Sequence, residues 1–147
     1  MPTDLWSFAC ACYARPGVEQ CCLHLQDGGA DVCLLLCALW LERRGVPCSE
    51  ARLARLKAVA EPWQRQVVQP LRELRRGLKE AARLDPQQAR LREQVKAMEL
   101  EAERELLKRL ESDAQQWQAS DVAAAWLEPL LVDRDARELL RAAAAGA

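Results

Sequence analysis

The sequence predicts an all-α fold: a helical bundle with a central buried helix and a long antiparallel helical hairpin. Three observations predict it. Every residue from Val32 to Leu41 is apolar, Leu, Ala, Arg, Glu and Gln dominate while Ile is absent, and apolar residues after Pro86 recur three and four positions apart. At 147 residues the chain is long enough for one domain with a real core. We expect a bundle portion at 1–61, a hairpin at 62–118 and short C-terminal helices at 119–147.

The apolar stretch Val32–Leu41 is the centre of this fold. A helix that is apolar on all sides has to be buried on all sides, and ten residues are about half of a membrane span. Asp31 is suited to cap its start, and Gly45 is a natural residue just after its end. The other segments must therefore surround this helix.

Two helices precede the central one, and a fourth follows it. Thr3 or Asp4 caps a helix from Leu5 to Ala14, and a turn at Pro16-Gly17 leads into a second helix over about 18–26. After the central helix, Ser49 is placed to cap the fourth.

The hairpin is predicted from its breaks and restarts. Glu61-Pro62 indicates a break, and a helical segment over 63–84 should kink at Pro70, because proline has no backbone donor. Asp85-Pro86 then caps and starts a long helix to about 117. The apolar stripe of this helix is predicted to face inward, and it comprises Leu91, Val95, Met98, Ala102, Leu106, Leu110, Ala114 and Trp117. A short helix over 120–131 and a last helix beginning at Asp133 complete the chain.

Charge is unevenly distributed: residues 1–51 carry −3, residues 52–92 carry +7 and residues 93–147 carry −5, for a net charge of −1. The most basic segment has a helical face that could contact an anion or a partner, formed by Arg65, Arg72, Arg76, Lys79 and Arg83. This face could bind a nucleic-acid backbone, an anionic membrane or an acidic partner, or it could pair with the acids of the next helix. We favour internal pairing. Nucleic acid is disfavoured, because no aromatic residues are interleaved with the arginines.

Three tryptophans are candidates for lining a pocket. Trp40 belongs to the core helix, while Trp63 and Trp117 should lie at the open end of the hairpin, where they could meet or flank a common pocket. We favour simple packing between hairpin and bundle over ligand stacking.

The seven cysteines and the single histidine do not form a recognised motif. Cys33, Cys37 and His24 could supply three ligands to a soft metal, and a thiolate–imidazole pair of Cys21, or Cys22, with His24 is conceivable. We favour buried cysteines instead, and expect no metal, cofactor or catalytic constellation. An odd number of cysteines suits a reducing compartment, and the chain shows no signal peptide and no transmembrane segment, so we expect a cytoplasmic protein.

Two stretches carry a resemblance to a known family: LWSFACACYARPGVEQCCLHLQ at 5–26 and GADVCLLLCALWLERRG at 29–45, with weaker matches at 61–79 and 95–110. The chain resembles the proteins grouped as domain of unknown function 2390. The family pattern often has Asn where this chain has Cys33. The resemblance implies a small bacterial cytosolic helical protein, and it brings no activity and no site residues.

The functional hypothesis is a non-catalytic protein-interaction or regulatory module that contacts a partner protein through the charged hairpin, with self-association open. It is motivated by the segregated charge and by the missing catalytic motif. The alternative is a binder or carrier of a small apolar ligand in the helical core, where enclosed apolar space suits such ligands.

Overall fold

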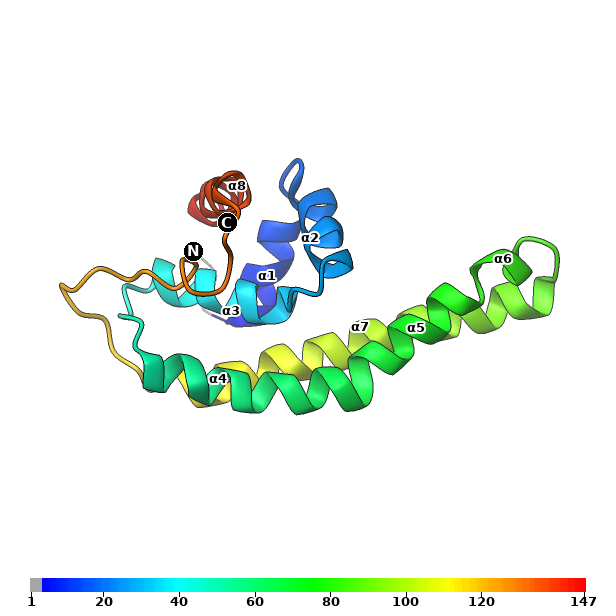
Figure 1. Ribbon diagram of the computed structural model, residues 1–147, viewed down its shortest axis with the longest axis horizontal. Coiled ribbons are helices and arrows are strands. Elements are labelled where there is room, and N and C mark those ends of the chain that lie inside the picture. The colour runs from blue at the N-terminus through cyan, green and yellow to red at the C-terminus, as the bar shows by residue number, and fades with distance from the viewer. Residues whose placement is uncertain (1–3) are drawn as a thin grey trace.

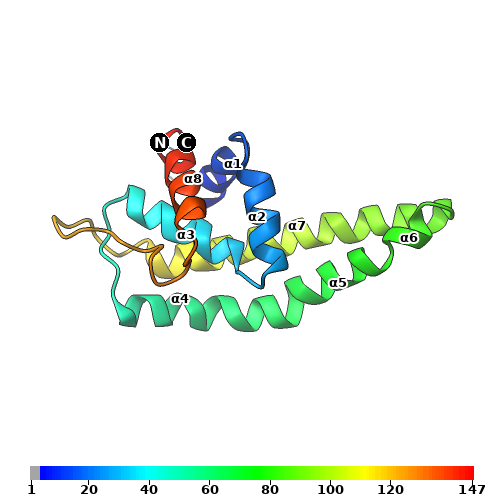
Figure 2. The same ribbon diagram turned by 45° about the horizontal axis from the view of Figure 1, so that its top comes forward.

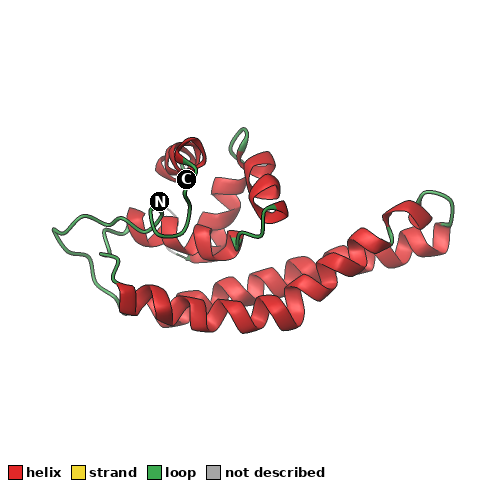
Figure 3. Cartoon of the chain, viewed as in Figure 1, coloured by secondary structure: helices red, strands yellow, loops and turns green. Residues whose placement is uncertain are grey.

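The computed structural model describes residues 4–147, and within that range every regular element is a helix (Figures 1 and 3). The elements are α1 (Leu5–Tyr13), α2 (Val18–Asp27), α3 (Val32–Arg43), α4 (Glu50–Trp63), the π-helical turn η1 (Gln64–Val68), α5 (Gln69–Gly77), α6 (Lys79–Ala82), α7 (Pro86–Ala114) and α8 (Arg134–Ala145). The predicted all-α fold is confirmed.

The helices form a bundle that sits on one side of a long hairpin. One arm of the hairpin runs through α4, η1, α5 and α6, and α7 returns alongside it (Figures 1 and 2). The helices α1, α2, α3 and α8 pack together over the half of the hairpin that contains α4. The other half, formed by α5, α6 and the first part of α7, projects beyond the bundle.

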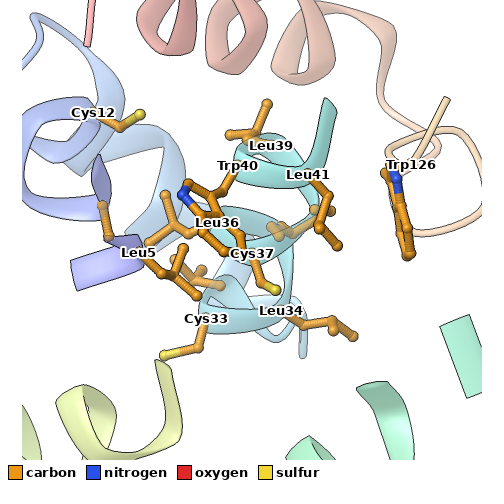
Figure 4. Close-up of a cluster of buried hydrophobic side chains, with 14 of the residues drawn as sticks. Leu5, Cys12, Cys33, Leu34, Leu36, Cys37, Leu39, Trp40, Leu41 and Trp126 are labelled. Carbon is orange, nitrogen blue, oxygen red and sulfur yellow. The ribbon is translucent and has the colours of Figure 1, made fainter. Parts of the chain in front are cut away.

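Helix α3 is the centre of the core, as predicted. All ten residues from Val32 to Leu41 are at most 6% exposed, because α1, α2, α4, α7 and α8 all contact this helix (Figure 4). Asp31 caps it by accepting a hydrogen bond from the backbone nitrogen of Leu34 at 3.0 Å. At the other end Gly45 has a φ of 73°, and the backbone nitrogen of Val46 donates to the carbonyl of Leu41 at 3.0 Å. This left-handed ending favours glycine, which confirms the predicted stop.

Other predicted caps are also present. Side chains of Asp4, Ser49, Asp85 and Asp133 accept hydrogen bonds from backbone nitrogens in the first turns of α1, α4, α7 and α8. Thr3, the other residue considered for the first cap, lies outside the described residues.

The predicted break at Glu61-Pro62 is wrong. Helix α4 runs through Pro62, and the chain continues as η1 and α5 without leaving a helical path. The π-helical turn lies directly before Pro70, where proline lacks a donor and would crowd the carbonyl of the preceding turn. A wider turn changes which carbonyls the following residues face, so the chain passes Pro70 by bulging and not by ending. The first arm therefore begins at Glu50.

The predicted short helix at 120–131 is also wrong, since residues 117–126 have no regular structure and residues 128–130 form only a turn. Instead, the segment is anchored from outside. The backbone nitrogens of Trp126 and Leu127 donate to the carboxylate of Glu42 at 2.9 and 3.2 Å, and the indole of Trp126 donates to the carbonyl of Val46 at 2.7 Å. These tertiary hydrogen bonds replace the ones that a helix would have made.

The predicted inward stripe of α7 holds in part. Buried as predicted are Val95, Ala102, Leu106, Leu110 and Ala114, but Leu91 and Met98 are 48% and 54% exposed, and Trp117 is half-buried beyond the end of α7. Glu99, only 7% exposed, faces the first arm instead. The reason lies on the opposite helix, where Arg72 and Arg75 present guanidinium groups to this carboxylate. Among the described residues, no helix is both long and apolar enough to cross a bilayer.

Candidate functional site on the hairpin

The five basic residues predicted to share a face have different environments. The side chain of Arg72 is only 10% exposed, and it lies 3.5 Å from Glu99 and 3.6 Å from Glu103 of α7, which is the internal pairing that we favoured. Arg76 contacts Asp27 of α2 at 2.7 Å. The remaining three, which are exposed, are Arg65, Lys79 and Arg83, the last within 3.6 Å of Glu80. The structure therefore divides the predicted face into an internal pair, a contact with the bundle and exposed cations.

A cluster of polar side chains fills the place where the hairpin meets the bundle, and we call it the polar junction. It comprises Asp31, Gln64, Arg72, Arg75, Glu99 and Glu103. The carboxylate of Glu99 accepts a hydrogen bond from Nε of Arg75 at 2.6 Å, and the amide nitrogen of Gln64 donates to Asp31 at 2.9 Å. Nε of Arg72 lies near Glu99 as an ion pair without hydrogen-bond geometry, and Oε1 of Gln64 has no partner among residues 4–147.

Burial shifts two acids of the polar junction, Asp31 and Glu103, toward their neutral forms. Desolvation raises the pKa of Asp31, and it raises the pKa of Glu103, which the neighbouring Glu99 raises further. The thiol of Cys33, which points toward α7 in Figure 4, has a pKa well above its ordinary value because it is buried and lies near Asp31.

Beside the polar junction lies a cavity of about 350 Å³ between the start of α3, the α4–η1 arm and the segment around Pro129. Its charged lining combines cations from Lys57, Arg65 and Arg72 with the carboxylates of Asp31 and Glu61. Opposite charges line one opening, so the cavity does not select for one sign of ligand charge on electrostatic grounds.

The candidate pocket-lining tryptophans are separated. Trp63 lies midway along the hairpin, because the first arm begins at Glu50. Its indole donates to the carbonyl of Ala102 at 2.9 Å, with the guanidinium of Arg109 3.9 Å from its ring centre. Trp117 stacks on Trp126 with ring centres 6.0 Å apart.

Arginines also lie over the rings of the other two candidate residues, Trp40 and Trp117. Arg44 lies 4.4 Å from the ring centre of Trp40, and Arg52 lies 5.1 Å from that of Trp117. Cation–π contacts and stacking therefore occupy ring faces that a ligand would need. The packing role that we favoured for these residues agrees with this arrangement.

A more apolar cavity lies elsewhere, between α1, α2, α3 and α7. It has a volume of about 220 Å³, and its lining includes Trp6, Tyr13, Val32, Leu36 and Leu107. Neither Trp63 nor Trp117 contributes to it. The sequence did not predict this cavity, since its lining residues read as ordinary core positions.

The projecting half of the hairpin exposes a set of apolar side chains that we call the outer face. It is formed by Leu71, Leu74, Leu78, Leu91 and Met98. Leu74, Leu91 and Met98 are 48–54% exposed, and Leu71 and Leu78 are half-buried.

The outer face points away from the bundle. Arg76 marks the bundle side of α5 through its contact with Asp27, and Leu74 lies about 160° around the helix from Arg76 at about 100° per residue. On α7 the bundle side is marked by the buried Leu107, and Met98 lies about 180° around the helix from it. Both helices therefore contribute apolar residues to the same, uncovered side of the hairpin.

The thiols and the histidine do not come together as a reactive site. Cys33 and Cys37 are buried in α3, while His24 is exposed on α2. Burial, and to a smaller extent Asp133, raises the pKa of Cys21, the opposite of the shift that activates a nucleophilic thiol. Within residues 4–147, no three His, Cys, Asp or Glu side chains are grouped as metal ligands would be.

Comparison with protein families places most of the chain in a known family. The family described as "Protein of unknown function (DUF2390)" matches residues 4–110 of the chain. The chain belongs to this family. The DUF2390 match spans α1 to α6 and most of α7, so it contains the polar junction and the outer face. Searches of curated proteins and of solved structures give no significant match.

For this DUF2390 protein, sequence reasoning missed the outer face, although a signal was present. Two overlapping stripes on α7 share Val95 and Ala102. One continues with Leu91 and Met98, the other with Arg92 and Glu99. Hydrophobicity selects the first stripe, and the arginines at 72 and 75 on the opposite helix are the only indication of the second.

Proposed function

We propose that this protein is a non-catalytic protein-interaction or regulatory module, and that a partner protein binds to the outer face. One observation supports this most directly: in the projecting half of the hairpin, apolar side chains lie outside while the carboxylate of Glu99 is buried inside. Exposed apolar surface costs about 25 cal/mol per Å², and a bound partner would recover that free energy.

The surroundings of the outer face suit a protein partner. Exposed charged residues such as Lys79, Arg90 and Glu101 border the apolar side chains. An apolar centre with a charged rim is the usual composition of a protein-binding surface, in which the rim contributes specificity.

Photo-crosslinking from defined positions tests this proposal. A photoreactive amino acid replaces Leu91 in the full-length protein, and a matched variant carries it at Leu23 of α2, a leucine of similar exposure on the bundle (45% against 48%). After irradiation in cells, we expect discrete protein adducts from position 91 and none from position 23.

A second substitution makes the result specific to the outer face. The adduct from position 91 should disappear when Met98→Glu is added, because a buried unpaired carboxylate opposes binding. Adding Arg43→Glu, at an exposed position on the bundle, should leave it unchanged. Absence of any adduct from position 91, or identical adducts from position 23, would overturn the proposal.

We also propose that the protein works in the bacterial cytoplasm. Its seven cysteines are all free thiols, and a reducing compartment preserves such thiols. Fractionation of cells that express the full-length protein, followed by immunodetection, tests the location, and recovery from the periplasm would contradict it.

A second candidate function, binding of a small apolar ligand, is supported by the 220 Å³ cavity near Trp6. Native mass spectrometry of the purified protein and thermal shifts with short fatty acids test it. Binding should be abolished by Cys10→Trp, which places a large ring among the lining residues. If the unmodified protein shows no co-purified adduct and no ligand-dependent thermal shift, this candidate function is removed.

A further inference from the structure

We infer that the protein bound to the outer face is a second copy of this chain, packed antiparallel about a two-fold axis. This inference rests on the proposed function of the outer face. It follows from the way in which the apolar and charged residues of that face are spaced along the two helices, because a two-fold interface requires a surface that complements itself.

The apolar rows on the two helices occupy the same length of the hairpin. Contacts between the arms set their register: Arg72 lies beside Glu99, and Nε of Arg92 donates to the carbonyl of Arg75 at 3.2 Å. Residues 71–78 of the first arm therefore run alongside about residues 91–99 of α7. The middle of the leucine row on α5 and the middle of the row on α7 lie at the same level.

One two-fold axis through that level places like surfaces against each other. On α7, Leu91 of each copy would face Met98 of the other. On the first arm, Leu71 of each copy would face Leu78 of the other, with the two Leu74 side chains near the axis. The four helices would form a bundle around the apolar side chains that the single chain leaves exposed.

The charged residues beside the α7 row are complementary under the same operation. Arg90 and Glu101 lie on the same flank of α7, just beyond Leu91 and Met98 respectively. Antiparallel packing brings Arg90 of one copy within about 3 Å along the axis of Glu101 of the other, twice. Both side chains are exposed, and neither takes part in the ion pairs found among residues 4–147.

The position of the bundle leaves room for this arrangement. The helices α1, α2, α3 and α8 lie on the opposite side of the hairpin from the outer face (Figure 2). Two copies that meet through their outer faces therefore carry their bundles on the two outsides of the pair, without collision. The face is small for a protein interface, so we expect reversible association with a Kd on the order of 1–10 μM.

Sedimentation of the full-length protein over a concentration series tests the second copy. We expect the mass to rise from one 16.5 kDa chain to twice that value. Leu74→Glu and Met98→Glu should each keep the protein monomeric at every concentration, with helical content retained. Leu23→Glu, at the matched leucine on the bundle, should leave the dimer unchanged.

A charge exchange tests the antiparallel register. Arg90→Glu alone and Glu101→Arg alone should each weaken the dimer about tenfold, since each replaces two attractive pairs with repulsive ones. The double variant restores both pairs and should recover the affinity. Failure of the double variant to recover, with both single variants weakened, would overturn the two-fold register.

The outcomes separate this inference from the function on which it rests. A chain that stays monomeric far above the expected Kd, but still gives adducts from position 91 with a different protein, overturns the second copy and keeps the interaction module. Adducts with the mass of two chains support both. A monomer without adducts removes both.

Discussion

Inside the hairpin, several charged side chains are buried and paired with one another. Taking an ion pair out of water costs several kcal/mol per ion, and the pair offsets this only when its geometry is good. At the polar junction, Glu99 meets two guanidinium groups, with its shortest contact, to Arg75, at 2.6 Å. Removing one partner from such a cluster leaves a buried charge unpaired. The removal therefore costs more free energy than the intact pair contributes to stability.

We expect Arg72→Ala to lower the free energy of unfolding by about 3–5 kcal/mol at neutral pH, because Glu103 loses its guanidinium and Glu99 one of two. Denaturant unfolding followed by circular dichroism measures this. Arg65→Ala, at an exposed arginine about two helical turns earlier in the same arm, is the control. It should change the free energy of unfolding by no more than about 0.5 kcal/mol.

The pH dependence of that loss is a further check. The folded-state pKa of Glu103 is already raised by burial and should rise more without Arg72. For an acid whose folded pKa exceeds its unfolded value, the protein loses stability as pH rises from the unfolded pKa, 4.5 for Glu103, through the folded pKa. Acidification to pH 5 should therefore reduce the loss of unfolding free energy caused by Arg72→Ala. An equal deficit at pH 5 and pH 8 would argue against this account.

Among the elements, the irregular segment before α8 depends on one carboxylate. Glu42 of α3 accepts hydrogen bonds from two backbone nitrogens of this segment, and from Arg141 of α8 at 2.7 Å. A loop that lacks its own hydrogen-bond ladder must be held by such outside partners.

Glu42→Ala should release this segment while leaving α3 folded. The amides of Trp126 and Leu127 would lose their acceptor, so we expect their hydrogen exchange to accelerate toward that of open backbone. Glu138→Ala, which removes only an exposed contact with Arg134, serves as the matched control. Unchanged exchange at Trp126 would contradict the anchoring role.

Acid should loosen the contact between this segment and α8. Hydrogen bonds from Arg141 lower the pKa of Glu128 to about 2 from its ordinary 4.5. Because the folded value lies below the unfolded one, the stabilisation is complete above about pH 4.5 and is lost as pH falls toward 2. Carboxyl NMR titration should find this low value in the unmodified protein and a value near 4.5 in Arg141→Ala.

For the molecule as a whole, α3 is the core against which α1, α2, α4, α7 and α8 pack. Its cysteines report on that core, because Cys33 and Cys37 are at most 6% exposed and burial raises the pKa of both thiols. Cys10, by contrast, is exposed.

We expect thiol alkylation at pH 8 to label Cys10 rapidly, and Cys33 and Cys37 only through global unfolding. Cys22, whose pKa burial raises to about 12, should also be protected. Mass spectrometry of modified peptides over time measures each site, and low denaturant should accelerate the two α3 cysteines in step with unfolding. Rapid labelling of Cys37 in native protein would show that the core opens locally.

Taken alone, the sequence determined the helices whose signals are local. Val32–Leu41 is apolar on every side, so it had to be the core, and capping residues such as Asp31, Ser49 and Asp85 lie directly before the helices that they start. The helical hairpin followed from the same signals. Such features depend on residues a few positions apart, which a sequence displays.

Only the tertiary structure decided what depends on distant residues. Arg72 and Arg75 of α5 pair with Glu99 between the two arms, and Leu91 and Met98 therefore face outward. Glu42 holds residues 126–127 in place of a helix, and the π-helical turn carries the chain past Pro70. In the first two cases a partner far away in sequence outweighs local preference, and in the third the packing of both arms keeps the chain helical. The outer face exists because charge pairing between the arms, and not hydrophobicity, determines which side of the first part of α7 faces the other arm.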